Sequence, residues 1–242
     1  MSYIFREHIK QSLAVIAFLI TLTACTSESY DAGDGPNSYL TADLVLLHTS
    51  QDKSVRSALL DDGTTLQFSN PFAQDWLTRP DSVYRALLYY DKTVAASDAA
   101  ASNPKATSIV RARSVSPVSV LRPVEAEDME TLRTDPVGFE SIWLSKNKSY
   151  INLSLLLKSG KTEADDALHA LGIVSHGTTT DADRRRTLHL TLYHDQGGVP
   201  AYYTVQQYVS IPTQLLEEAD TVELTLNTYN GKKVVKVAVS NL

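Results

Sequence analysis

The sequence predicts an all-β protein, with an N-terminal OB-like five-stranded barrel followed by a C-terminal antiparallel β-sandwich. Short segments rich in β-branched and aromatic residues recur from residue 38 onward, and clusters of Gly, Pro, Asn and Asp separate them. No long segment has the spacing of an amphipathic helix. A charged stretch without a strand pattern, residues 124–136, separates the predicted barrel (38–123) from the predicted sandwich (124–242).

Five strands are expected in the barrel. The first is "SYLTADLVLLHT", and the next two flank residues 61–63, Asp-Asp-Gly, which are a hairpin turn signal. "SVYRALLYYDK" is the fourth, and the fifth contains Pro117, which predicts an edge, a bulge or a strand break. Residues 70–81 connect the third strand to the fourth, and the Ala- and Ser-rich residues 94–107 form a long loop after the fourth. This spacing favours a Greek-key barrel of the OB type.

Seven further strands are expected in the second half. Asn230-Gly231 lies between the last two and is the strongest short-range hairpin signal, while residues 195–200 form another turn. One helical turn is expected at "TQLLEEA". Many short strands with such turns indicate a β-sandwich. The predicted strands are 139–145, 149–159, 167–176, 187–195, 201–211, 221–229 and 232–240.

Residues 1–24 have the composition of an export signal. Arg6 and Lys10 precede an uncharged apolar run, residues 12–22, which is shorter than the roughly 20 residues of a membrane-spanning helix. The run ends in Leu-Thr-Ala-Cys, which resembles a bacterial lipobox. That resemblance implies cleavage before Cys25 and acylation of this cysteine. Several acyl chains anchor a protein durably, because each buried methylene contributes about 0.8 kcal/mol.

Cys25 is the only cysteine of the chain, so the folded part would contain no disulfide and no thiol chemistry. The alternative is an ordinary secretory signal with an isolated cysteine. We expect residues 25–37, rich in Ser, Asp and Gly, to be a flexible tether from the membrane. An outer-membrane location follows from the lipobox resemblance. Glu28 and Asp31 favour the cell surface over the periplasmic side, because surface lipoproteins contain acidic residues at this place.

The charge of the chain argues against nucleic acid as a partner. The net charge is −6, and the one basic cluster, Asp183 to Arg186, contains too few arginines to bind a phosphate backbone. We interpret that cluster as a solvated loop.

No catalytic motif, cofactor motif or metal site is predicted. The chain contains no Gly-x-Ser-x-Gly, P-loop or Gly-x-Gly-x-x-Gly sequence. His189 and His194 lie on one predicted strand at an odd spacing, which directs them to opposite faces and prevents joint metal binding. His194 is in register with the apolar residues of that strand, so we expect it to be partly buried and hydrogen-bonded. His169 and His176, also an odd number of residues apart, meet the same objection.

Two tyrosine pairs, Tyr89-Tyr90 and Tyr202-Tyr203, have two interpretations. Strand alternation would direct one ring of each pair inward and the other outward. Alternatively the rings form an exposed aromatic platform for sugar or protein. The long loops 94–107 and 178–186 are further candidate ligand sites.

The order of several segments resembles the NigD-like lipoproteins of Bacteroidota. After the lipobox come "SYLTADLVLLHT", "LLDDGTTLQFS" and "VSVLRPV". The second half contains "DPVGFESIWLSKNKSYINLSLLLKSG", "TLHLTLYHDQGGVPAYY" and "VELTLNTYNGK". The resemblance extends from about residue 38 to residue 239. It implies an OB-like barrel and a C-terminal sandwich, and it implies no established activity.

The sequence therefore predicts a lipid-anchored protein of the cell envelope that binds a protein or a glycan and is not an enzyme. A bacteriocin-immunity role is one alternative, and an envelope hydrolase is another. Asp81-Ser82-Val83 and Asp220-Thr221-Val222 resemble extracytoplasmic O-glycosylation sites, which makes Ser82 and Thr221 candidate modification sites.

Overall fold

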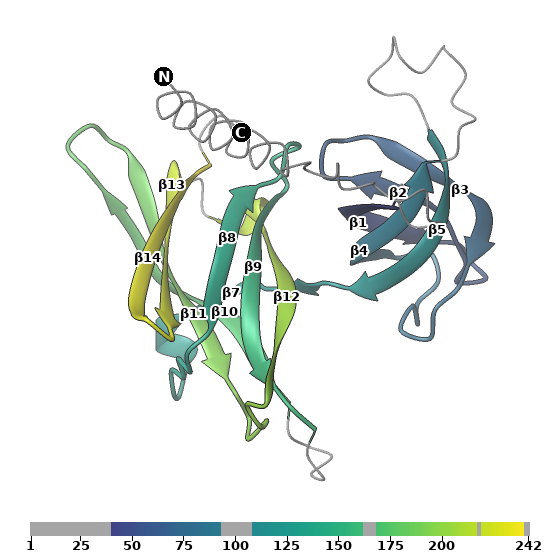
Figure 1. The fold of residues 1–242 in the computed structure, drawn as a ribbon. Coiled ribbons are helices and arrows are strands. Elements are labelled where there is room, and N and C mark those ends of the chain that lie inside the picture. The colour runs from purple at the N-terminus through teal and green to yellow at the C-terminus, as the bar shows by residue number, and fades with distance from the viewer. Residues whose placement is uncertain (1–39, 93–107, 162–167, 217–218, 240–242) are drawn as a thin grey trace, which may run out of the picture. The chain divides into compact units, whose positions relative to one another are not determined.

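The computed structural model describes residues 40–92, 108–161, 168–216 and 219–239 (Figure 1). Residues 40–242 form one compact unit. The predicted signal peptide, Cys25, the tether and the loop at residues 94–107 lie outside the described residues. No helix among the described residues has both the length and the apolar character needed to cross a membrane.

The first five strands close into a barrel. They are β1 (Leu40–Thr49), β2 (Val55–Leu60), β3 (Thr65–Phe72), β4 (Val83–Lys92) and β5 (Ser108–Pro117). The strand order is β1-β2-β3-β5-β4, and β1 pairs with both β2 and β4 to close the ring. The β3–β5 pair is parallel and the other pairs are antiparallel. The predicted five-stranded Greek-key barrel is confirmed.

The barrel core is formed by side chains from alternate positions of its strands. The turn at Asp61–Thr64 that joins β2 to β3 is confirmed, with Gly63 in the left-handed region at φ 88°. The connector between β3 and β4 contains a single turn, in which the Leu77 amide donates to the Gln74 carbonyl at 3.0 Å. This turn buries Leu77 in the barrel core, which also contains Val45, Leu47, Val55, Ala58, Leu60, Leu66, Phe68, Ala86, Leu88, Tyr90 and Val110.

The remaining strands form two packed sheets. One sheet has the order β14-β13-β11-β10-β7, and the other has the order β6-β12-β9-β8. The strand bounds are β6 Ser119–Val120, β7 Pro123–Glu125, β8 Gly138–Leu144, β9 Tyr150–Ser159, β10 Ala170–Thr180, β11 Arg186–Asp195, β12 Tyr203–Pro212, β13 Thr221–Thr228 and β14 Gly231–Ala238. Short 3₁₀ turns lie at Ala126–Asp128 and Thr213–Leu215, the second within the predicted helical turn.

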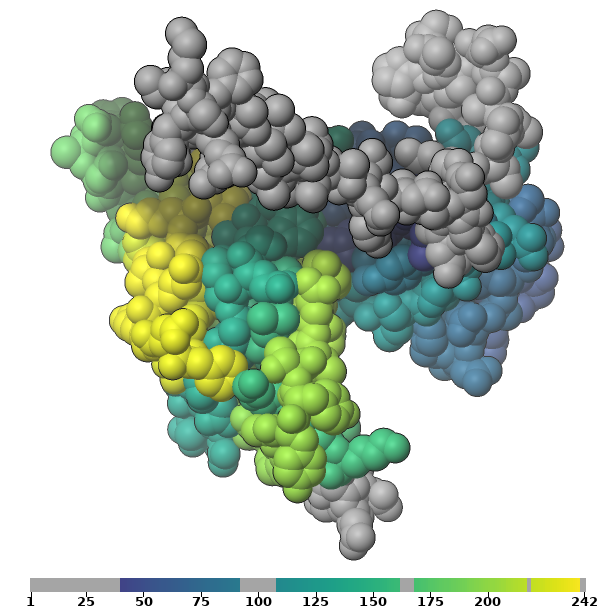
Figure 2. All heavy atoms as spheres, in the orientation of Figure 1, coloured from purple at the N-terminus to yellow at the C-terminus, as the bar shows by residue number. Residues whose placement is uncertain are grey.

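All seven predicted sandwich strands are present as β8 to β14, so the sandwich is confirmed. Three strand pairs are parallel, however: β11–β13, β10–β7 and β12–β6. The β11–β13 pair is parallel because β12, which separates them in sequence, belongs to the opposite sheet. In Figure 2 the yellow β14 lies beside the teal β8, and contacts between these two strands link the edges of the two sheets.

The sandwich core results from strict alternation along β9 and β11. Ile151, Leu153, Leu155 and Leu157 of β9 lie inside, facing the apolar residues Leu188, Leu190 and Leu192 of β11. Full burial of each such side chain contributes about 1.5–3 kcal/mol. The even-numbered residues of β9 therefore lie on the outer face of the four-stranded sheet.

The barrel connects directly to the sandwich. β5 ends at Pro117 as the proline predicted, and only the buried Val118 separates it from β6. The predicted boundary at residue 124 assigns β6 and the first residue of β7 to the barrel. Both strands nevertheless pair with sandwich strands. We propose that the domain boundary lies at Val118.

Candidate functional site

A buried ion pair lies where the barrel meets the sandwich. Arg85 of β4 donates two hydrogen bonds to the carboxylate of Asp61, from Nη1 to Oδ1 at 2.6 Å and from Nη2 to Oδ2 at 2.7 Å. Its side chain is only 1% exposed. The guanidinium also lies over the ring of Tyr150, 4.3 Å from its centre. Asp61 was predicted only as a turn residue, and its carboxylate is held by Arg85.

The sandwich provides the other partners of this pair. Arg85 donates to Asn152 Oδ1 at 3.0 Å and, through Nε, to Ser210 Oγ at 3.1 Å. Asn152 Nδ2 donates to Asp61 Oδ2 at 2.9 Å, and Ser210 Oγ donates to Asn152 Oδ1 at 2.7 Å. Asn152 and Ser210 are completely buried. The four side chains Asp61, Arg85, Asn152 and Ser210, named here the Arg85 network, form a closed hydrogen-bonded set.

The Arg85 network fixes the geometry between barrel and sandwich. A bidentate arginine–carboxylate pair with further hydrogen bonds has a narrow range of allowed orientations. Asp61 lies in the β2–β3 turn, and its carbonyl also accepts from the Asn147 amide at 2.6 Å in the β8–β9 turn. Any surface shared by the two domains is therefore preorganised.

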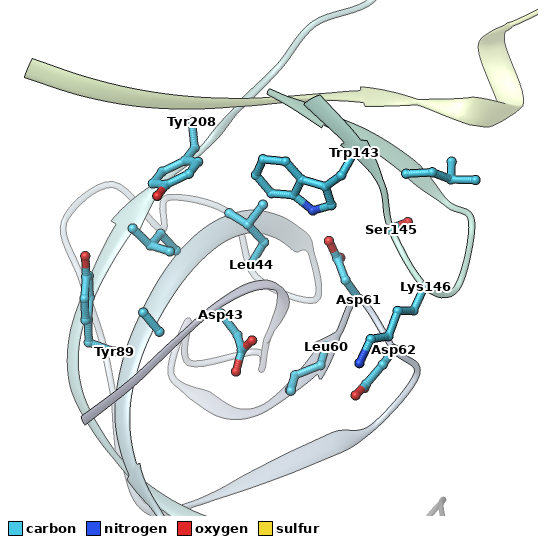
Figure 3. Close-up of a pocket in the computed structure, with 13 residues that line it drawn as sticks. Asp43, Leu44, Leu60, Asp61, Asp62, Tyr89, Trp143, Ser145, Lys146 and Tyr208 are labelled. Atoms are coloured by element: carbon cyan, nitrogen blue, oxygen red, sulfur yellow. The ribbon is translucent and has the colours of Figure 1, made fainter. Parts of the chain in front are cut away.

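A cavity of about 340 Å³ lies beside the Arg85 network (Figure 3). The barrel lines it from β1, β4 and the end of β2, and the sandwich lines it from β8, β12 and the β8–β9 turn. Trp143 and Tyr208 form an edge-to-face pair with ring centres 6.4 Å apart. In Figure 3 these rings lie on the sandwich side and Tyr89 on the barrel side. The lining residues are Ala42, Asp43, Leu44, Leu60, Asp61, Asp62, Leu87, Tyr89, Trp143, Leu144, Ser145, Lys146 and Tyr208.

Two further carboxylates of the cavity wall are held by the barrel. Asp43 Oδ2 accepts from the Tyr90 hydroxyl at 2.8 Å, and burial together with Asp43 raises the pKa of Tyr90 far above its usual value. Asp62 Oδ1 accepts from the Thr64 amide at 2.9 Å. That backbone hydrogen bond, with a smaller contribution from Lys146, lowers the pKa of Asp62. The barrel therefore fixes the position of both carboxyl groups in the cavity wall.

A polar cluster lies on the outer face of the same sheet. Ser154 Oγ donates to Glu140 Oε2 at 2.6 Å, and Gln206 Nε2 donates to the same oxygen at 2.5 Å. These two hydrogen bonds lower the pKa of Glu140. The β8–β9 register shifts between Phe139 and Ser141, so Glu140 occupies a β-bulge, a feature that redirects side chains in functional sites.

The C-terminal part of the chain matches a known family. Residues 120–239 match the model of the NigD-like C-terminal beta sandwich domain. The chain belongs to the NigD-like family. This confirms the family resemblance found in the sequence. No curated protein sequence matches the chain.

Solved structures share the NigD-like fold over most of their length. A NigD-like immunity protein from Bacteroides caccae is 22% identical, covers 81% of this chain and 91% of its own, and has a TM-score of 0.59. A candidate lipoprotein from Bacteroides fragilis is 13% identical, with 83% and 98% covered and a TM-score of 0.58. A candidate toxin-related protein from Parabacteroides distasonis is 20% identical, with 82% and 92% covered and a TM-score of 0.53. At these identities the likeness is one of fold.

The histidines of this NigD-like protein confirm the alternation predicted for β11. His194 is buried, and its Nδ1 lies 3.0 Å from the Asp135 carbonyl oxygen. His189 lies on the outer face of its sheet, between Thr179 and Glu223. No group of three or more metal-ligating side chains is found among the described residues.

Sequence reasoning missed one histidine pair. His169 Nδ1 lies 3.0 Å from His194 Nε2, and the two rings stack with centres 5.2 Å apart. Burial, and then the neighbouring His194, lowers the pKa of His169. The pair joins the start of β10 to the end of β11 across their antiparallel ladder, a proximity that follows only from the hairpin register.

Acidification should destabilise the sandwich through this pair. In the unfolded chain His169 takes up a proton near pH 6.5, whereas in the folded state its lowered pKa opposes protonation. The contribution of this pair to the free energy of unfolding is then complete above pH 6.5 and decreases as the pH falls below that value. We expect urea-unfolding free energies measured between about pH 8 and about pH 5.5 to show this loss, and His169→Asn to reduce it. An unchanged pH slope in His169→Asn, relative to the exposed control His48→Asn, would contradict this assignment.

The tyrosine pairs behave differently from one another. Tyr90 is buried in the barrel and Tyr89 lines the cavity, so alternation is confirmed for this pair. Tyr202 and Tyr203 are both exposed, at 79% and 50%. The prediction that one ring of this second pair is buried is wrong, because the pair lies at the start of β12, where both sides of the strand are open. The predicted aromatic platform therefore has a structural basis at Tyr202.

The other candidate residues occupy ordinary structural positions. Ser82 lies just before β4, where its hydroxyl donates to the Pro80 carbonyl at 2.8 Å. Thr221 is the first residue of β13 and is partly buried between its neighbours on β11 and β14. O-glycosylation of Ser82 and of Thr221 stays a prediction. Residues 178–186 form the β10–β11 hairpin, in which Asp181 Oδ1 accepts from the Asp183 and Arg185 amides at 2.9 Å.

Proposed function

We propose that this NigD-like protein is a non-catalytic binding protein of the cell envelope whose ligand occupies the cavity beside the Arg85 network. The observation that supports this is the composition of the cavity wall. Trp143 and Tyr208 provide aromatic faces, and Asp43 and Asp62 provide acceptors on the opposite wall. A concave apolar site with a few fixed polar groups is the usual form of a ligand pocket.

We further propose that the protein is held at the outer membrane by acyl chains on Cys25. The lipobox resemblance supports this, and so does the fold shared with a candidate lipoprotein. Protease treatment of intact cells that express a C-terminally tagged protein tests the orientation. Loss of the tag from wild-type protein would support the cell surface, and its survival until lysis would support the periplasmic side. Cys25→Ser is the control that lacks the anchor.

A binding role suits the cavity better than hydrolysis. No histidine is present among the described residues that line the cavity. The Asp61 carboxylate is held by Arg85 and Asn152, and Asp43 accepts from Tyr90. These carboxylates are fixed as acceptors in the wall, an arrangement that orients a bound group.

Tryptophan fluorescence can test the cavity directly. The chain contains two tryptophans, and Trp76 lies in the β3–β4 connector against Tyr84, with ring centres 5.8 Å apart. Trp76→Phe therefore leaves Trp143 as the only tryptophan reporter, in the cavity wall. We expect its emission to change on titration with the polysaccharide fraction of the producing cell's envelope. Binding of the detergent-solubilised protein fraction, which has tryptophan emission of its own, would be measured on the immobilised protein instead.

The binding measurement has a matched pair of variants. Trp143→Ala should weaken binding of the active fraction about tenfold or more, since central aromatic residues dominate binding energy. Ile109→Ala, which truncates an exposed barrel residue outside the cavity lining, should leave binding unchanged. Binding unaffected by Trp143→Ala would exclude the cavity as the ligand site.

The bacteriocin-immunity alternative makes a separate prediction. One related structure is named an immunity protein, and the exposed Leu168 and Tyr203 offer apolar contacts for a protein partner. An immunity role requires that deletion of the gene sensitises cells to a bacteriocin and that plasmid expression restores protection. Unchanged sensitivity of the deletion strain would exclude this role without affecting the binding proposal.

A further inference from the structure

The outer face of the four-stranded sheet continues from the cavity toward the far end of the sandwich. Along β12 the side chains of Tyr208, Gln206 and Thr204 alternate onto this face, opposite Ser154, Leu156 and Lys158 of β9. Tyr208 also lines the cavity, so the face and the cavity are continuous. We name this row, from Tyr208 to Tyr202, the β12 track.

Tyr202 ends the β12 track. Its amide donates to the carbonyl of Ser159, the ladder partner of Tyr203, at 2.9 Å, which fixes its backbone beside the end of β9. A Cβ added to Gly160 would lie 2.7 Å from Tyr202 Cδ2. The absence of a Cβ at Gly160 thus leaves room for the ring beside the backbone, while 79% of Tyr202 stays exposed. Tyr208 lies six positions after Tyr202, which corresponds to about 20 Å along an extended strand.

Polar side chains lie between the two aromatic ends of the track. Glu140, Ser154 and Gln206 form the hydrogen-bonded cluster described above, in which both donors use Oε2 of the carboxylate. Further along, Lys158 Nζ donates to Thr204 Oγ1 at 3.0 Å and lies 5.9 Å from the centre of the Tyr229 ring. The charges of Glu140 and Lys158 offset one another, so the track has no net charge.

We infer that the ligand of this protein is a linear, uncharged glycan that extends from the cavity along the β12 track. This inference rests on the proposed function and specifies its ligand. Sugar rings stack on exposed aromatic faces, and their hydroxyl groups exchange hydrogen bonds with short amide, hydroxyl and carboxylate side chains. A chain of sugars can contact aromatic residues at both ends of the track and polar groups in its middle.

An extended peptide fits the same face less well. Peptides that bind sheets usually add a strand to an open edge through main-chain hydrogen bonds. One edge strand of this sheet is β8, and the bulge at Glu140 interrupts its ladder. At the other edge β6 pairs with β12 only at Val209 and Ser210, so addition of a peptide strand along residues 203–208 is the alternative that the envelope protein fraction tests. β8 is also contacted by β14 of the opposite sheet. The exposed groups of the track are side chains that recognise hydroxyls.

A panel of defined polysaccharides tests the ligand class. The full-length mature protein with Trp76→Phe would be titrated with neutral polymers (laminarin, mannan, xylan, dextran) and with the acidic polymers chondroitin sulfate and polygalacturonate. The same polymers would be used in affinity gel electrophoresis. We expect at least one neutral polymer to bind and the acidic ones not to bind. Binding of acidic polymers alone, or of the envelope protein fraction alone, would overturn the inference while leaving the cavity proposal intact.

Two neighbouring tyrosines provide the variant and its control. Tyr202→Ala should weaken binding of the neutral polymer about tenfold and leave binding of its disaccharide unchanged, because the disaccharide reaches only the cavity. Tyr203→Ala removes an exposed ring from the next residue, whose side chain points to the other side of the sheet. Binding of the polymer and binding of the disaccharide should both be unchanged. Gln206→Ala should reproduce the effect of Tyr202→Ala.

The outcomes separate this inference from the proposed function. In one outcome, Trp143→Ala loses binding of the polymer while Tyr202→Ala and Gln206→Ala bind it as the wild type does. That result would refute the β12 track and support the cavity alone. Equal losses of affinity in Tyr202→Ala and Tyr203→Ala would mean that the ligand contacts both sides of the sheet at this end of the sandwich. That result would refute the track. No effect of Trp143→Ala on a polymer that binds would refute the proposed function itself.

Discussion

Replacing Arg85 with methionine should lower the free energy of unfolding by about 3–5 kcal/mol, the usual cost of removing one partner from a buried ion pair. Methionine fills a similar volume, but Asp61 would then retain a largely buried charge with Asn152 as its remaining partner in the network. Ser210 and Asn152 would each lose a donor as well. Urea denaturation followed by circular dichroism measures the change as a shift of the transition midpoint.

Arg56→Met is the matched control for this experiment. Arg56 pairs with Asp52 at 3.8 Å, and the two side chains are 63% and 61% exposed. An exposed ion pair contributes about 0–1 kcal/mol, so the control should unfold nearly as the wild type does. The double variant Arg85→Met with Asp61→Leu should regain part of the lost stability, because it leaves no unpaired charge. Equal midpoints for Arg85→Met and Arg56→Met would contradict the buried Arg85 network.

Truncating Leu153 to alanine should cost about 2–5 kcal/mol. Leu153 is completely buried on the inner face of β9, within the core formed by both sheets. Removing most of its side chain leaves a cavity that the surrounding strands cannot fill, since both sheets are held by their ladders. Thermal or urea unfolding of the purified variant measures the loss.

Leu156→Ala tests whether the effect depends on the face of the strand. Leu156 belongs to the same strand and has the same size, but it lies on the outer face and is only partly buried. Its truncation should cost about 1 kcal/mol, the typical value for a point substitution, because the side chain is only partly removed from water. A larger loss in Leu156→Ala than in Leu153→Ala would mean that the inner and outer faces of β9 are assigned in reverse.

Local patterns in the sequence predict the fold because strand formation depends on neighbouring residues. The alternation of leucines along β11 is enough to place His194 inside and His189 outside. The Asp-Asp-Gly turn and Pro117 also predict where strands begin and end. The short β6 and β7 could not be predicted, because two or three residues contain too little pattern to distinguish a strand from a loop.

The candidate site could not be predicted in the same way because its parts are distant in sequence. Arg85 and Ser210 are 125 residues apart, and Asp61 and Asn152 are 91 apart. Arg85 occupies an outward position of β4, where a solvated arginine is ordinary, so nothing local indicates its burial. Trp143 and Tyr208 likewise meet only through the pairing of β8 and β12 with β9.

The single residue between β5 and β6 has a consequence for the kinetics of ligand binding. Val118 is buried, and its amide donates to the Arg85 carbonyl at 3.0 Å, so the connection cannot act as a hinge. The cavity cannot close over a ligand by domain rotation and must receive it in its existing shape. In stopped-flow experiments on Trp143 fluorescence, the observed rate should rise linearly with ligand concentration and show no plateau.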